Sequence, residues 1–159
     1  IDLRDAPQFD ALSYVWGPPE PCKQLEINGE VFKISPNLHE AIYSLSRVNS
    51  LHNLWVDAVC INQMDLQERH HQVMMMADIY RSASTVRIFL GKDLPAKTAL
   101  FRYWKRTQTL QETPIEKAAA ELGAPLQNLL NDFLEFILRP WWIRVWTQQE
   151  YALARNDPV

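Results

Sequence analysis

The feature that most constrains this chain is residues 54–69, an apolar run that ends in a dense polar loop and then in the start of a helix. The apolar part is typical of a buried strand, and Asp65 with Glu68 three residues later resembles a helix capping box. Open α/β sheets place their binding sites where an apolar strand ends in such a loop. The run therefore predicts an α/β fold and the position of a binding site within it.

Strand and helix signals alternate along the rest of the chain. Core strands, rich in aromatic and β-branched residues, are predicted at residues 9–16, 53–58 and 85–90. Helices are predicted to start at Ser35-Pro36 and to cover residues 65–83 and 141–154. This alternation predicts a mostly parallel sheet flanked by helices.

Two further segments are predicted to be additions to that sheet. Asn28-Gly29 separates two short alternating runs, residues 25–27 and 31–34, and Asn-Gly is the strongest short-range hairpin signal. We expect this β-hairpin to decorate one edge of the sheet. Residues 93–138 are predicted to form a helical insertion. The chain's 159 residues suit one domain, and because both ends are abrupt we expect it to be part of a larger multidomain protein.

Charge and motif content narrow the classes of function. Sixteen Lys and Arg against 19 Asp and Glu give a net charge of −3, which argues against nucleic acid as the main partner. The sequence contains no apolar run of membrane-spanning length, no signal peptide and no cysteine motif, so we expect a cytoplasmic domain. It also contains no glycine-rich phosphate loop and no zinc pattern, and we expect no metal and no permanently bound cofactor.

Three polar residues of the loop after residue 56 have two interpretations each. Asp57 would either hold ligand hydroxyls or cap the loop by accepting hydrogen bonds from backbone N–H groups. Asn62 and Gln63 carry amides that suit base or ribose recognition, and that suit pinning the loop to its own backbone equally well.

Arg69 lies in the first turns of the predicted long helix, where the helix dipole favours anions. A cation in that place indicates a phosphate bound at the helix N-terminus or a carboxylate partner. The structural alternative is an ion pair with Asp57 or Glu150.

The last predicted helix contains Trp142, Trp146 and Glu150, which its periodicity puts on one face. A carboxylate beside that apolar surface would have a raised pKa and would suit acid–base or transition-state chemistry. The alternative is that both tryptophans are core residues and that Glu150 is a solvated helix residue.

Four segments stand out together. They are residues 11–17 (ALSYVWG), 34–38 (ISPNL), 54–63 (LWVDAVCINQ) with Glu68, Arg69 and Gln72, and 139–150 (RPWWIRVWTQQE). Together they resemble the heterokaryon incompatibility (HET) domain of filamentous fungi. Their order, spacing and residue identity all agree with the family pattern, and only minor departures occur, at Val56, Val59 and Thr147.

The resemblance implies an intracellular fungal module that triggers cell death when non-self is sensed, beside regulatory or sensor domains. HET domains are also thought to resemble TIR domains, which have a flavodoxin-like fold, and some TIR domains cleave NAD. In those enzymes a Trp shortly precedes the catalytic Glu, and Trp146 and Glu150 are similar in character. By this analogy Glu150 is the expected catalytic residue and NAD the expected substrate.

The same analogy implies roles for other residues. Asp57 would hold a ribose hydroxyl, Arg69 would meet the pyrophosphate, and Trp16 or Trp146 would stack on a ring. Further substrate-binding positions expected around the cleft are Ser13, Tyr14, Gly17, Asn62 and Gln63.

Two alternatives to an NAD-cleaving enzyme stay open at this stage. One is a non-enzymatic signalling module that self-associates and triggers cell death through protein–protein contacts. The other is a metal-dependent nuclease using Asp57, Asp65 and Glu68.

Overall fold

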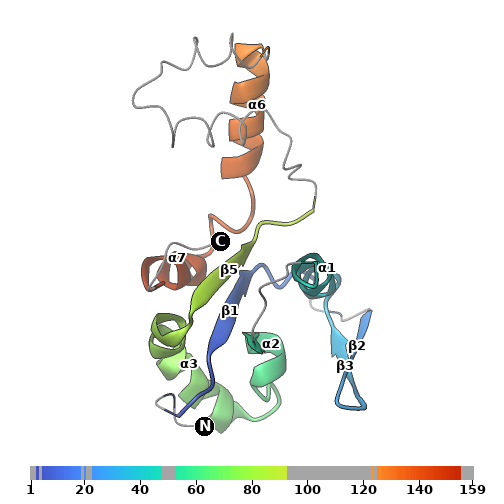
Figure 1. Ribbon diagram of the computed structural model, residues 1–159, viewed down its shortest axis with the longest axis vertical. Helices are drawn as coiled ribbons and strands as arrows, with labels where there is room; N and C mark the ends of the chain where they lie inside the picture. Colours follow the sequence, from blue (N-terminus) through green and yellow to red (C-terminus); the bar gives the residue numbers. More distant parts are fainter. Residues whose placement is uncertain are drawn as a thin grey trace. The chain divides into compact units, whose positions relative to one another are not determined.

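The computed structural model describes residues 3, 5–18, 20, 23–47, 53–92, 123 and 125–154 of the chain. Its centre is a parallel sheet of three strands in the order β4-β1-β5 (Figure 1). These are β4 (Asn53–Trp55), β1 (Phe9–Tyr14) and β5 (Thr85–Phe89). All six residues of β1 are buried, as expected for the middle strand of a sheet covered on both faces. The predicted parallel α/β sheet is therefore confirmed.

The two faces of the sheet have separate cores. Phe9 and Ala11 pack with Ile79 and Tyr80 of helix α3 (Leu66–Ser82), and Leu12 packs on the other face with residues of α1 (Pro36–Leu45). The helices α1 and α3 lie on opposite sides of β1 (Figure 1). This arrangement follows because the right-handed crossovers from β1 to β4, through α1, and from β4 to β5, through α3, run in opposite directions across the sheet.

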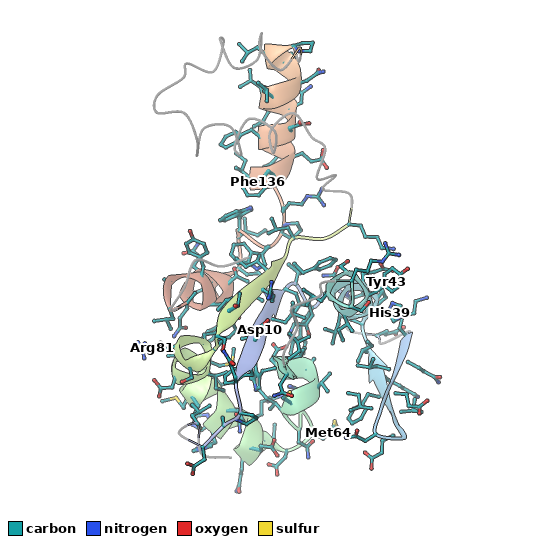
Figure 2. The ribbon with its side chains drawn as sticks, viewed as in Figure 1. Asp10, His39, Tyr43, Met64, Arg81 and Phe136 are labelled. Atoms are coloured by element: carbon teal, nitrogen blue, oxygen red, sulfur yellow. The ribbon has the colours of Figure 1, made fainter. Side chains whose placement is uncertain are left out.

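A buried ion pair joins the central strand to its neighbour. Asp10 is completely buried, and Figure 2 shows it on β1 within the sheet. Its Oδ2 accepts a hydrogen bond from Nε of Arg87 on β5 at 3.0 Å. A buried charge is tolerated when it is paired in this way.

The predicted hairpin is confirmed, but its expected position is wrong. β2 (Lys23–Ile27) and β3 (Glu30–Ile34) form a two-stranded antiparallel sheet of their own, separate from the parallel sheet. Asn28 and Gly29 have φ values of 54° and 84°, which a tight hairpin turn requires. Leu25 and Phe32 pack against the core under α1, so side chains and not strand pairing attach the hairpin.

Two of the three predicted helix starts are confirmed at their N-caps. The Ser35 hydroxyl accepts a hydrogen bond from the backbone of Leu38 at 3.2 Å, and Asp65 accepts from the backbone of Gln67 and Glu68 at 2.9 and 3.1 Å. The second half of the capping box is wrong. The Glu68 carboxylate accepts from the backbone N–H of Asn62, at 3.0 Å, and ties the preceding loop to the helix.

The predicted strand at residues 53–58 is too long. β4 ends at Trp55, and the helical turn α2 (Asp57–Cys60) follows directly. The Asp57 carboxylate accepts from the N–H of Ala58 at 2.7 Å, and the carbonyl of Val56 accepts from Cys60 at 2.8 Å. These local hydrogen bonds favour a turn over extended backbone.

The last helix is shorter than predicted. α7 covers Val145–Ala152, while the N–H of Trp142 bonds to the carbonyl of Arg139 at 3.1 Å in a separate turn. Trp142 and Trp146 therefore do not share a helix face. α7 packs beside α3 and β1 (Figure 1).

The chain divides into two compact units, Ile1–Gly91 with Ile143–Val159, and Lys92–Trp142. The second unit contains helix α6 (Leu126–Ile137), which starts directly after Pro125. Of the predicted insertion at residues 93–138, residues 93–122 lie outside the described part of the chain. None of the described helices is long and apolar enough to span a membrane.

Candidate functional site

A cleft of about 290 Å³ lies beyond the carboxyl ends of β1 and β4, between α2, α3 and α7. We call it the carboxyl-end cleft. Apolar side chains from Ile61, Val73 and Met76 form part of its wall. The cleft also brings together six of the site residues predicted from the sequence: Trp16, Asp57, Gln63, Arg69, Trp146 and Glu150.

Glu150 is a buried carboxylate. Only 7% of its surface is exposed, and the hydroxyl of Ser13 on β1 donates a hydrogen bond to its Oε2 at 2.5 Å. Burial raises the pKa of Glu150, and the charge of Asp57 adds to the rise, while the Ser13 hydroxyl and Arg144 oppose it. The interpretation of Glu150 as a solvated helix residue is wrong. The sheet, and not Trp142, supplies the surroundings that perturb it.

Tyr80 of α3 is a second group behind Glu150, and the sequence analysis did not single it out. Its side chain is 2% exposed, and its hydroxyl donates to the carbonyl of Leu12 at 3.0 Å. Burial and then the charge of Glu150 raise the pKa of Tyr80, so the phenol stays neutral beside the Glu150 carboxylate.

Asp57 is the second carboxylate of the cleft. The indole Nε1 of Trp16 donates to its Oδ2 at 2.7 Å, and the hydroxyl of Tyr14 also hydrogen-bonds it. Burial raises the pKa of Asp57, whereas these donors and the N–H of Ala58 lower it. The structural interpretation of Asp57 is confirmed, because Oδ1 accepts from the backbone N–H of Ala58, and the residue also lines the cleft, where a ligand role stays a prediction.

Arg144 lines the cleft and was missed in the sequence analysis. It is the N-cap residue of α7, and its guanidinium donates to the carbonyl of Tyr14 at 2.6 Å. It belongs to residues 139–150, one of the segments that carry the family resemblance, but its contact with Tyr14 depends on α7 packing beside β1. Arg69 is exposed, and no ion pair joins it to Asp57 or Glu150, so the predicted structural pairing is wrong.

The remaining predicted residues lie around the cleft or behind it. Gln63 lines the cleft and donates to the carbonyl of Asp57 at 2.9 Å, whereas the Asn62 side chain accepts from the N–H of Met64 at 3.1 Å and pins the loop. Ser13 and Tyr14 are buried behind the two carboxylates. Gly17 does not line the cleft. Its φ of 77°, a backbone conformation that residues with a side chain rarely adopt, explains why a glycine stands there.

The arrangement combines two carboxylates of raised pKa, two arginines and two tryptophans. Carboxylates can stabilise a developing positive charge, guanidinium groups bind phosphate oxygens, and indole rings stack on planar groups. No cluster of three or more His, Cys, Asp or Glu suited to a metal ion occurs in the described residues. The nuclease hypothesis, which needs Asp57, Asp65 and Glu68 around a metal, therefore has no support from the geometry.

Comparisons with known proteins agree on one family. The chain matches the family described as "Heterokaryon incompatibility protein (HET)" over residues 9–150. It is 25% identical over 190 residues to "Heterokaryon incompatibility protein 6, OR allele" of Neurospora crassa, a match that covers 94% of this chain. The chain spans 28% of the length of that relative. No solved structure matches the chain.

Proposed function

The chain belongs to the heterokaryon incompatibility (HET) family, and on that premise we propose that it is a cell-death effector domain of fungal non-self recognition. It acts in the cytoplasm, beside regulatory or sensor domains, by cleaving NAD or a related nucleotide at the nicotinamide–ribose bond when it is clustered. The observation that carries the enzymatic part is the buried Glu150, hydrogen-bonded to Ser13 and lining the same cleft as Asp57.

The topology supports a TIR-like fold. In chain order, the strands of the sheet lie second, first, third, which is the arrangement of the first three strands of flavodoxin-like folds. Folds of this class bind ligands outside the carboxyl ends of their strands. The cleft with Asp57 and Glu150 lies at that end.

The proposed reaction breaks the bond between the nicotinamide nitrogen and C1′ of the ribose. Its electron pair goes to the ring nitrogen, so nicotinamide leaves as a neutral molecule and needs no acid. The positive charge that develops on the ribose is stabilised by ionised Glu150, with Asp57 on a ribose hydroxyl. Water then adds to C1′, and its proton passes to the Glu150 carboxylate, whose raised pKa suits that role.

The rest of the substrate is held by the other cleft residues. Arg69 and Arg144 bind the pyrophosphate, and Trp16 or Trp146 stacks on a ring. At about 290 Å³ the cleft is at the lower end of the usual range for ligand sites. We therefore place the nicotinamide and its ribose inside the cleft and the adenosine outside.

The test is nicotinamide release from NAD by the chain fused to an oligomer-forming scaffold. Glu150→Gln is expected to lower the rate by about 100-fold or more. The matched control is Glu26→Gln on the exposed face of β2, which is expected to keep the wild-type rate. Equal rates for wild type and Glu150→Gln, or no release by the clustered wild type, would contradict the proposal.

A second candidate is the non-enzymatic, self-associating module. It is favoured by two apolar side chains at the start of α7, Ile143 and Val145, which are each 80% exposed. Cell death induced by expression of Glu150→Gln but lost in Val145→Lys, with a change from oligomer to monomer in sedimentation, would support the module over the enzyme.

A further inference from the structure

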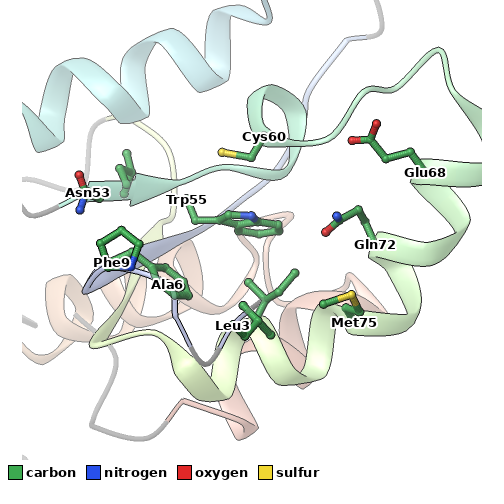
Figure 3. A pocket seen from close by; sticks show the side chains of 12 residues that line it. Leu3, Ala6, Phe9, Asn53, Trp55, Cys60, Glu68, Gln72 and Met75 are labelled. Carbon is green, nitrogen blue, oxygen red and sulfur yellow. The ribbon is translucent and has the colours of Figure 1, made fainter. Parts of the chain in front are cut away.

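A second cavity, of about 520 Å³, lies along β4 and α3 and reaches the amino ends of β1 and β4 (Figure 3). We call it the amino-end cavity, because Phe9 and Asn53, the first residues of β1 and β4, are part of its wall. Its volume is within the usual range for small-molecule sites, about 300–1,000 Å³. Nothing in the proposed reaction uses it.

The wall of the amino-end cavity is apolar on one side and polar on the other. Figure 3 shows the Trp55 ring in the middle of the cavity, with Phe9 on one side and Glu68 and Gln72 of α3 on the other. The edge contact between Trp55 and Tyr80, with ring centres 5.8 Å apart and planes at 80°, fixes the orientation of the indole. The cavity therefore offers a fixed aromatic surface beside a carboxylate and an amide.

Glu68 has spare capacity to bind a ligand. One oxygen accepts from the N–H of Asn62 at 3.0 Å, and a carboxylate has about four acceptor positions in total. Glu68 and Gln72 also belong to the segment that carries the resemblance to the HET family, yet neither lines the carboxyl-end cleft. The proposed function leaves both residues without a role.

We propose that the amino-end cavity is a second ligand site, for an arylalkylamine whose planar ring packs on Trp55 and whose ammonium group pairs with Glu68. A negative carboxylate next to an indole face selects a cation over a neutral or anionic group. The apolar side chains around Trp55, such as Phe9 and Met75, select a flat apolar body.

Occupancy of this site is coupled to the carboxyl-end cleft, a part of the inference that rests on the proposed function. Glu68 holds the backbone of Asn62, and the next residue, Gln63, donates to the carbonyl of Asp57 at 2.9 Å. When a ligand's ammonium group pairs with Glu68, the carboxylate moves towards the cavity. The hydrogen bond that Glu68 accepts from the N–H of Asn62 is then weakened. The ligand therefore lowers the affinity of the cleft for a nucleotide, and the nucleotide lowers that of the ligand by the same factor.

The binding test uses tryptamine, with indole as its uncharged counterpart, and follows the indole N–H signals of the tryptophans by NMR. The Trp55 signal is assigned from Trp55→Phe. Tryptamine is expected to shift this signal saturably and to bind about tenfold more tightly than indole. Glu68→Gln is expected to remove that difference, and Glu26→Gln on the exposed face of β2 is expected to keep it.

A size variant gives an independent check. Met75→Trp fills the cavity and is expected to abolish binding of both probes, whereas Met74→Trp, at a neighbouring position that is 72% exposed, keeps it. The proposal is overturned if tryptamine does not shift the Trp55 signal at millimolar concentrations, if indole binds as tightly, or if Met75→Trp still binds.

The coupling is tested by titrating ADP-ribose with and without saturating tryptamine. A weaker ADP-ribose affinity with tryptamine, and no such change in Glu68→Gln, is the expected result. An unchanged affinity overturns the coupling. If ADP-ribose does not bind at all, the proposed function fails, and the tryptamine titration still decides whether the amino-end cavity is a ligand site.

Discussion

The two ends of the parallel sheet carry cavities of different chemistry. The carboxyl-end cleft, about 290 Å³, holds two carboxylates whose pKa values burial has raised, together with two arginines. The amino-end cavity is larger, about 520 Å³, and is mainly apolar around Trp55. The larger cavity is thus not the one with groups suited to catalysis. Perturbed carboxylates locate a reaction better than volume does.

One helix separates these two regions. Along α3, Glu68 and Gln72 line the amino-end cavity, whereas Arg69 and Val73, their neighbours in sequence, line the carboxyl-end cleft. Successive residues of a helix point about 100° apart, so a helix can form a wall of both cavities. The two regions are consequently close enough to influence each other through α3 and the loop before it.

The largest expected effect on stability is at the amino-end cavity. Trp55→Ala removes a ring that lines this cavity and packs on Tyr80, and it is expected to lower the free energy of unfolding by about 3 kcal/mol. Trp146→Ala, whose side chain is 50% exposed at the cleft, is expected to cost less than about 1 kcal/mol. Urea unfolding measures the free energy of unfolding of both variants. Equal losses of stability would contradict the difference in packing between the two cavities.

A smaller loss is expected at the cleft when the support of Glu150 is removed. Ser13→Ala deletes a buried donor and is expected to cost about 1–2 kcal/mol. Because the Ser13 hydroxyl lowers the pKa of Glu150, that pKa is expected to rise further, which NMR of labelled glutamate measures. Ser44→Ala on the exposed face of α1 is the control. An unchanged pKa of Glu150 would show that Ser13 does not support the carboxylate.

The buried Glu150 carboxylate is also expected to lower the stability of the folded state at neutral pH. The pKa of Glu150 is raised in the folded state, so protonation of Glu150 favours folding. The stability that this protonation contributes at low pH is lost as pH rises through the raised pKa. Glu150→Gln is therefore expected to raise Tm by about 2–4 °C at neutral pH. This gain shrinks as pH falls towards the ordinary pKa of glutamate. A lower Tm for the variant at neutral pH would contradict the raised pKa.

The smallest expected effect is at the rim of the cleft. Trp16→Phe removes the hydrogen bond from the indole to Asp57, and because Trp16 is 40% exposed the stability is expected to change by less than about 1 kcal/mol. The pKa of Asp57 is expected to rise, since the Trp16 donor lowers it. NMR titration of labelled aspartate measures the shift. A fall in the pKa of Asp57 would show that the Trp16 indole does not stabilise its carboxylate.

Features that depend on neighbours in sequence were predictable. The Asn28-Gly29 turn and the Ser35 and Asp65 caps use contacts over two or three residues, and the structure has all of them. Six predicted site residues also meet in one cleft, because parallel strands bring their carboxyl ends to one edge.

Features that depend on distant parts of the chain were not predictable. Tyr80 and Arg144 contact the site only because α3 and α7 pack against β1. The prediction that Trp142 and Trp146 share a helix face was wrong, because Trp142 lies in a separate turn after Arg139 and α7 begins only at Val145. The amino-end cavity combines β1, β4 and α3, and no single segment signals it.

The hydrogen bond from Ser13 to Glu150 joins positions that are 137 residues apart. On the ribosome, all three strands are synthesised before α7, and at about 5–20 residues per second the codon for Glu150 follows several seconds after the last strand. A nascent chain at that stage has the residues of these strands but lacks the carboxylate that faces Ser13. The hydrolysis proposed for this domain therefore cannot begin until translation has passed α7.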